Sequence, residues 1–290
     1  MLITNTPWLS DINVKSVCLC YKIVDMKKEY FSLIPIPRNV FSIFVTLNVM
    51  GYDDENNPRG MSPIRMAIRK KVVASGNWKD KYPEIYKNIK ANHFWHLLNK
   101  ILNRKKTGDK NNFLKELHTF SKEHLVQEAW KKFQIYEKRE FIKIDNSSMR
   151  NEISRFLSYI GRPNKKINKI KIILNPLDAY WRGYGLKIGN NGYIVAGPGM
   201  DKNNYELIRH EILHLFYYSF RIPAYMTYVK THKKIAFFGY VNSKMIREEY
   251  IVRALNLLYE KDVLKKDIRT DIKKEGKNFP YLNKVMALIK

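Results

Sequence analysis

Cysteine is scarce in this 290-residue chain, which has only Cys18 and Cys20, both within the segment SVCLCYK. Residues i and i+2 of a strand point to the same side, and a bridge between such close neighbours has poor disulfide geometry. A framework of disulfide bonds is therefore excluded, and a single C-x-C pair is a weak metal-binding signal. We interpret both cysteines as small apolar residues of a strand.

Long apolar runs are also lacking. No apolar stretch approaches the roughly 18 residues that a membrane-spanning helix needs. The first residues, MLITNTPWLSDINVK, contain no basic segment followed by an apolar one, so they do not have the pattern of a secretory signal peptide. These two absences predict a cytoplasmic protein without a membrane span.

Acidic residues are few beside the basic ones. The chain has 27 Asp and Glu against 53 Lys and Arg, a formal net charge of +26. Such an excess brings nucleic acids and anionic surfaces into consideration as partners. The basic residues are scattered, however, and Lys, Asn and Ile are abundant together. We favour a solvated, lysine-rich surface, with nucleic-acid binding as the alternative.

What the chain does contain is typical of a folded protein: 45% apolar and 13% aromatic residues. Strands are predicted where β-branched and apolar residues cluster: at 13–24, 40–49, 169–177 and, as a hairpin around GNNG, 184–197. Helices are predicted where apolar residues recur at helical spacing: across 64–161, after PGMDKNN, at 243–260 and after Pro280. This order predicts an α+β fold. We expect residues 1–166 and 167–290 to form two sides of a cleft, within one continuous domain or two.

The most informative stretch is IRHEILHLFYYSF, residues 208–220. On a helix, His210 and His214 lie one turn apart on the same face. Both imidazoles can then reach one zinc ion at about 2.0–2.1 Å, and the carboxylate of Glu211 lies where it can take a proton from water at the metal. The apolar residues fall on the opposite side of the helical wheel: Ile208, Ile212, Leu215 and Phe216. The alternative is two histidines hydrogen-bonded on a helix face.

A hydrolytic zinc needs a third protein ligand. Glu248 and Glu249 lie within SKMIREEYIVRAL, a predicted buried helix on which an unpaired carboxylate would be costly. We favour Glu249, because it shares its side of the helix with Arg253 and Asn256. The alternatives are Glu248, an ordinary Glu249–Arg253 surface pair, and His232 in the basic segment KTHKK.

HEILH followed by a glutamate on a later helix resembles the gluzincin arrangement of the zincin metallopeptidases. The segments GYDDENN, IILNPL, HEILHLF and EEYIVRA also resemble an uncharacterised bacterial and archaeal family of zincin-like proteins. The resemblance implies a zincin-like region with a small mixed sheet, an edge hairpin, the HExxH helix and a glutamate-bearing helix. It also implies zinc held by His210, His214 and Glu249, with Glu211 as general base. The spacing to the glutamate is longer than in the thermolysin type, and the metzincin extension is absent.

These observations predict a zinc-dependent metallopeptidase acting on a peptide or protein substrate. A side chain near the metal should stabilise the oxyanion. We name Arg253 for this role, and the eligible tyrosines are Tyr217, Tyr218, Tyr225, Tyr228 and Tyr240. The hairpin before the HExxH helix can offer an edge to an extended peptide, or be purely structural. The alternatives are a zinc hydrolase with a non-peptide substrate and a basic, nucleic-acid-binding protein with a non-catalytic HExxH.

Overall fold

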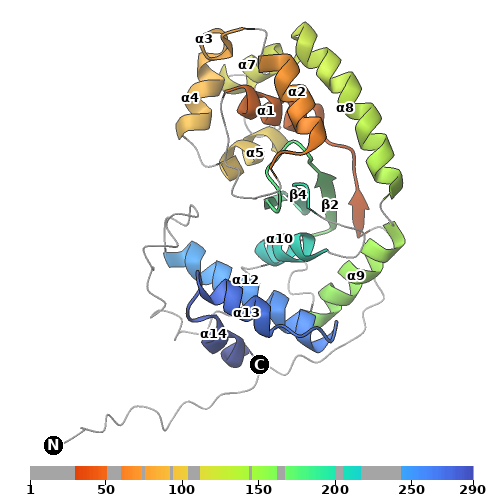
Figure 1. The fold of residues 1–290 in the computed structure, drawn as a ribbon, viewed down its shortest axis with the longest axis vertical. Helices are drawn as coiled ribbons and strands as arrows, with labels where there is room; N and C mark the ends of the chain where they lie inside the picture. The colour runs from red at the N-terminus through yellow and green to blue at the C-terminus, as the bar shows by residue number, and fades with distance from the viewer. Residues whose placement is uncertain are drawn as a thin grey trace, which may run out of the picture. The chain divides into compact units, whose positions relative to one another are not determined.

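The computed structural model describes residues 30–50, 60–73, 76–91, 94–103, 112–143, 146–161, 167–199, 205–216 and 243–289 (Figure 1). The strand predicted at 13–24, both cysteines and His232 lie outside these residues. The described residues form two compact units, which are considered separately below. The larger unit contains residues 30–158 and 167–216, with the gaps just given, and the smaller contains 159–161 and 243–289.

The larger unit is built around a four-stranded sheet. Its strands are β1 (Phe31–Leu33), β2 (Lys169–Leu174), β3 (Gly183–Ile188) and β4 (Asn191–Ala196), in the order β1-β2-β4-β3. The first three strands of that order are parallel, whereas β3 pairs antiparallel with β4 and lies at the edge. The β3–β4 turn uses Gly189 at φ 58°, a conformation that favours glycine. The predicted strand and hairpin are confirmed, while β1 was not predicted.

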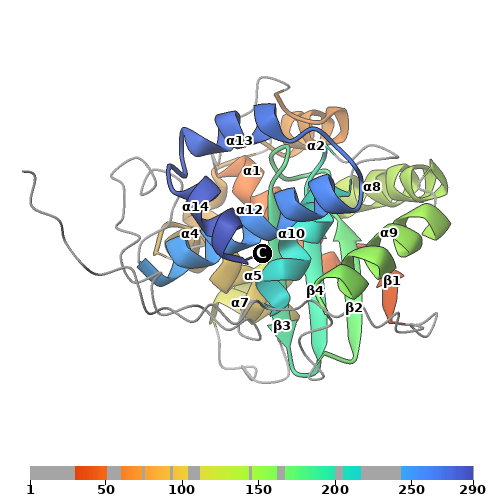
Figure 2. The ribbon, with the colours of Figure 1, turned by 90° about the horizontal axis from the view of Figure 1, so that it is seen from below.

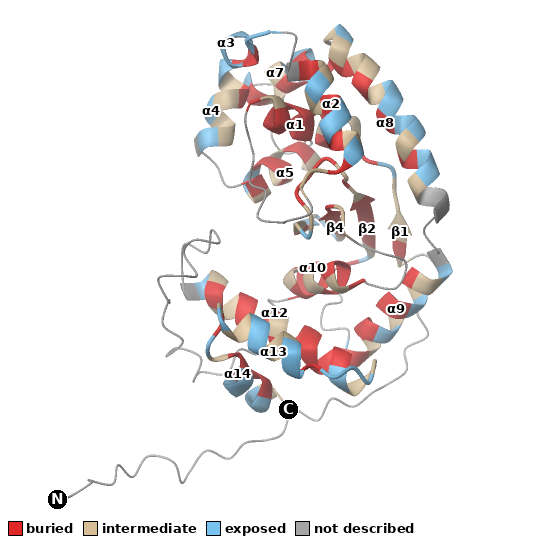
Figure 3. Ribbon diagram, in the orientation of Figure 1, coloured by how far each residue is buried: buried red, intermediate tan, exposed pale blue. Residues whose placement is uncertain are grey.

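Helices cover one face of this sheet (Figures 1 and 2). The block of helices predicted over 64–161 is divided in the structure into α2 (Pro63–Val73), α3 (Trp78–Lys81), α4 (Pro83–Ala91), α5 (Phe94–Leu102), α7 (Asn112–Ser121), α8 (His124–Lys143) and α9 (Asn146–Tyr159). The last of these, α9, does not belong to the layer on this face. Tyr184, Leu186 and Val195 of the sheet belong to the same buried core as most of these helices. Figure 3 marks buried residues along α5 and β2, which contribute to this core.

The segment 40–49, predicted as a strand, is instead part of helix α1 (Arg38–Val49). Every residue from Val40 to Asn48 is buried, so no polar face reveals the helical period, and periodicity alone does not separate a buried strand from a buried helix. The hydroxyl of Ser42 donates to the Arg38 carbonyl at 2.9 Å, and that of Thr46 donates to the Ser42 carbonyl at 2.8 Å. The helix thus satisfies the buried hydroxyls of Ser42 and Thr46 with its own carbonyl groups.

Helix α10 (Glu206–Phe216) packs against β3 and β4 on the face opposite the layer of α1, α2, α5 and α8 (Figure 2). Alternation along β3 explains how the sheet serves two layers, because successive side chains point to opposite faces. Tyr184 and Leu186 enter the helical core. Gly183 and Gly185 face α10, where an added Cβ would lie within 3 Å of Glu211 atoms. The predicted HExxH helix is confirmed.

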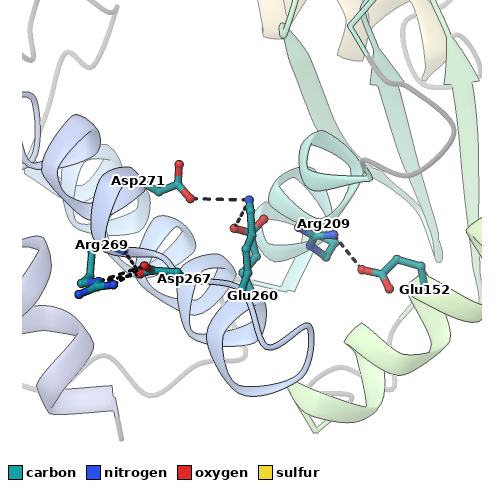
Figure 4. Close-up of polar contacts among 7 residues, drawn as sticks. Glu152, Arg209, Glu260, Asp267, Arg269 and Asp271 are labelled. Atoms are coloured by element: carbon teal, nitrogen blue, oxygen red, sulfur yellow. Dashed lines mark hydrogen bonds and ion pairs between the residues drawn. The ribbon is translucent and has the colours of Figure 1, made fainter.

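The smaller unit contains α12 (Ser243–Asp262), α13 (Arg269–Gly276) and α14 (Leu282–Ile289). The first and last of these were predicted, whereas α13 was not. Tyr250 and Phe279 pack edge to face, with ring centroids 5.2 Å apart. Where α12 leads into α13, Lys266 contacts Glu260 at 2.9 Å and Asp271 at 3.6 Å (Figure 4). The predicted burial of the EEYIVRAL segment is confirmed, since Glu249 to Val252 are all buried.

The predicted α+β class is confirmed: the described residues are mostly helical, with one small mixed sheet. The units do not follow the chain order, because residues 167–216 belong with the preceding helices. Among the described helices, none is both long and apolar enough to cross a membrane.

Candidate metal site

Helix α10 presents two kinds of residue on its two sides. Ile208, Ile212 and Phe216 are at most 1% exposed, and their burial stabilises the helix against the sheet. His210 and His214 are half-buried, and Glu211 between them is buried. Glu206 in the first turn suits the positive end of the helix dipole. The predicted division of the helix into an apolar back and a histidine-bearing front is confirmed.

The two histidines converge. Their Nε2 atoms are 3.1 Å apart, with ring centroids 4.9 Å apart and ring planes at 69°. One potential ligand atom from each of His210, Glu211 and His214 lies within 4.8 Å of the other two. Among the described residues, His210, Glu211 and His214 form the one group of three or more His, Cys, Asp or Glu side chains that could hold a metal ion. The HExxH spacing therefore produces the clustering expected of a metal site.

Two glycines of strand β3 make room for Glu211. A Cβ at position 183 would lie 2.7 Å from both Cγ and Oε1 of Glu211. A Cβ at position 185 would lie 2.6 Å from the backbone oxygen of Glu211. Real Cβ contacts are longer than this. The missing side chain at Gly183 therefore makes room for the Glu211 carboxylate, and the missing side chain at Gly185 makes room for the backbone of α10. The base candidate is thereby held directly beside the edge strand.

A third glycine, Gly192, allows α10 to approach the sheet closely near the C-terminal end of the helix. A Cβ at Gly192 in β4 would lie 2.8 Å from Cδ1 of Leu215. The close approach of α10 to the sheet thus extends from Glu211 to the C-terminal turn of the helix. Trp95 of α5 donates its indole N–H to the Gly185 carbonyl at 3.0 Å, which ties this edge strand to the helical layer.

A buried ion pair anchors α10 on its other side. Arg209, next to His210, contacts Glu152 of α9 at 2.8 Å, and their side chains are 3% and 11% exposed (Figure 4). A charge-assisted hydrogen bond in such surroundings is strong and directional. Because Arg209 and His210 are adjacent on one helix, this bond restricts the rotation of α10 about its axis.

Tyr184 is the titratable side chain of β3 closest in sequence to these glycines. Burial, above all, and the negative charges of Asp178 and Glu211 raise the pKa of Tyr184 well above its ordinary value. The phenol is therefore protonated throughout the physiological range, and it belongs to the core layer.

The predicted third ligand lies in the smaller unit. Glu249 is 4% exposed and accepts a hydrogen bond from Nε of Arg253 at 3.1 Å. Arg253 also contacts Glu275 at 2.6 Å, and its guanidinium carbon lies 4.4 Å from the centroid of the Phe279 ring. Glu248 is less buried than Glu249. The Glu249–Arg253 pair weighed in the sequence is therefore present, and the ligand role of Glu249 and the catalytic role of Arg253 stay predictions.

The tyrosines eligible for oxyanion stabilisation, Tyr217, Tyr218, Tyr225, Tyr228 and Tyr240, lie outside the described residues. Sequence reasoning missed Glu152, Arg209 and the three glycines. The G-x-G pattern at 183–185 was the available signal, because alternate glycines leave one face of a strand without side chains. Nothing comparable marks Glu152, since its partner is 57 residues away.

Comparison with known proteins gives no relatives: no family model, no curated protein and no solved structure matches this chain.

Proposed function

We propose that this chain is a zinc-dependent metallopeptidase in which His210 and His214 hold the metal. The observation that carries the proposal is the 3.1 Å separation of their Nε2 atoms. Two nitrogens bound at about 2.0–2.1 Å to a tetrahedral zinc ion lie about 3.3 Å apart, so little movement is needed for both to bind one ion. The half-buried histidines meet the further requirement of access from solvent.

A bound zinc ion would supply Lewis-acid polarisation of a substrate carbonyl and acidify a water molecule. Glu211 would accept the proton of the attacking water and pass it to the leaving amine. Its placement supports this role, because Gly183 leaves room for the carboxylate and one ligand atom of Glu211 lies within 4.8 Å of ligand atoms of His210 and His214. We favour a peptide as substrate because β3 is an edge strand, to which an extended peptide can pair.

The third protein ligand in this proposal is Glu249, as the sequence predicts. A buried carboxylate is a suitable donor, and its hydrogen bond from Arg253 is typical of the outer partners that orient a ligand. Arg253 remains our candidate for stabilising the oxyanion.

The proposal is tested by zinc content and hydrolysis together. We expect purified protein to contain one zinc ion per chain and to cleave a mixed peptide library. His210→Ala and His214→Ala should lose the metal, and Glu249→Gln should weaken metal binding by about 10- to 100-fold more than Glu248→Gln. Glu211→Gln should keep the metal and lose about 100- to 10,000-fold in rate, as expected for removal of a general base.

The matched control is His118→Ala, which removes an exposed histidine from α7 and should leave zinc content and rate unchanged. A metal-free wild-type protein would contradict the metal site. A zinc-loaded protein that cleaves no peptide would contradict the peptidase assignment alone.

A further inference from the structure

Trp181 has an unusual backbone conformation in the segment that joins β2 to β3. Its φ of 62° lies in the left-handed region. Among the described residues other than glycine, Lys265 also has a positive φ. A bulky side chain rarely adopts this conformation, and such outliers concentrate at functional sites. Trp181 is also 38% exposed, so part of its side chain remains accessible to solvent.

The surroundings hold the backbone of this segment in place. The backbone N–H of Trp181 donates to the Pro198 carbonyl at 2.9 Å, and the backbone N–H of Arg182 donates to the Ala179 carbonyl at 3.4 Å. The ring rests on Gly199, where an added Cβ would lie 3.0 Å from Cε2 of the indole. Gly199 itself has a φ of 115°, which only glycine adopts readily. The backbone that carries the indole is therefore held in place, and the ring has one side covered by Gly199.

The same segment leads directly to the candidate site. Gly183, two residues after Trp181, is the glycine against which the Glu211 side chain packs. Trp181 thus precedes the edge strand by two residues, and its partly exposed indole is carried close to the backbone position against which the proposed base packs. A rigid aromatic surface binds apolar groups at a low cost in conformational entropy. The formal net charge of +26 disfavours cationic substrates.

We propose that Trp181 is a specificity-determining residue that binds an aromatic or large aliphatic side chain of the peptide substrate near the scissile bond. This inference rests on the proposed peptidase function. The strained backbone is then the structural cost of presenting the ring to the substrate, and the glycine beneath it keeps the ring in position.

The test compares Trp181→Phe, Trp181→Ala and Trp181→Gly with wild type. The substrates are two peptides that differ only in Phe or Ala next to the bond cleaved in the library. We expect Trp181→Ala to raise KM for the Phe peptide by about tenfold and to change kcat and the Ala peptide by less than about twofold. Trp181→Phe should retain most of the preference. Trp181→Gly should lose it yet melt at a higher temperature than Trp181→Ala, because glycine adopts positive φ without strain.

Two further measurements separate the possible causes. Ile135→Ala removes an exposed apolar side chain from α8, 56% exposed, and should leave both peptides unaffected. Binding of the Phe peptide to Glu211→Gln, measured by calorimetry, should weaken when Trp181→Ala is added. Hydrolysis with an unchanged Phe-to-Ala preference in Trp181→Ala would overturn this inference and leave the peptidase standing. Failure of wild type to cleave either peptide would overturn both.

Discussion

At the scale of single residues, the glycines of β3 carry much of the site. Gly183 faces the side chain of Glu211, while Gly185 faces its backbone carbonyl. Side-chain atoms can rotate away from an added methyl group, whereas a helix backbone moves only with its whole packing layer. Two chemically identical substitutions two residues apart should therefore have different consequences.

We predict that Gly183→Ala displaces the Glu211 carboxylate, lowering the hydrolysis rate at least about tenfold while zinc content stays unchanged, because a base out of hydrogen-bond reach transfers protons poorly. Gly185→Ala should instead destabilise the protein by about 1–3 kcal/mol, as overpacking does. Denaturant unfolding and rate measurements on both variants check this. Gly276→Ala is the control, since a Cβ there meets nothing within 4 Å. Equal losses of stability in the two β3 variants would contradict the distinction.

At the scale of elements, the Arg209–Glu152 bond is the polar link between α10 and α9 in Figure 4. We predict that Glu152→Gln destabilises the fold by about 3 kcal/mol, because it leaves a buried guanidinium without its carboxylate. Replacing both partners together, with Glu152→Met and Arg209→Leu, should recover most of that loss.

Chemical denaturation of the single and double variants measures this effect. Glu84→Gln serves as the control, because the Glu84–Lys87 contact is 4.0 Å long and its side chains are 37% and 76% exposed. Removing such a surface pair should cost no more than about 1 kcal/mol. A double variant less stable than the Glu152 single variant would show that the bond does more than neutralise Arg209.

The elements differ in how far the sequence predicts them. Helix α10 was predictable because His210 and His214 break its apolar pattern on one side only, which reveals the helical period. Helix α1 was not, because it is buried all around and its β-branched residues are equally typical of a strand. The hairpin followed from GNNG and alternation. The packing of Gly183 against Glu211 depends on which faces meet, and this is a tertiary property that no single segment contains.

At the scale of the whole molecule, metal binding and folding should be linked. A ligand that binds only the folded chain stabilises it by about 4 kcal/mol at about 1,000 times its Kd. If His210 and His214 hold zinc, a chelator should lower the melting temperature on the order of 10 °C. Calorimetry with and without chelator measures this shift. The control variant His118→Ala should show the same drop in melting temperature as wild type.

The corresponding measurement on His210→Ala provides the contrast, since this variant should melt at the same temperature with or without chelator. A chelator effect of equal size in His210→Ala would place the stabilising ion elsewhere in the chain.

The alternation of glycine with bulky residues in β3 has a consequence for folding fidelity. A slip of the hairpin by one residue exchanges the two faces of a strand. Tyr184 and Leu186 would then be driven against the backbone of α10, and the core would receive Gly183 and Gly185 in their place. The misaligned hairpin would lose its core contacts and its packing against α10. Such misaligned pairing is therefore unstable, and the strand that positions the proposed base also favours the correct register.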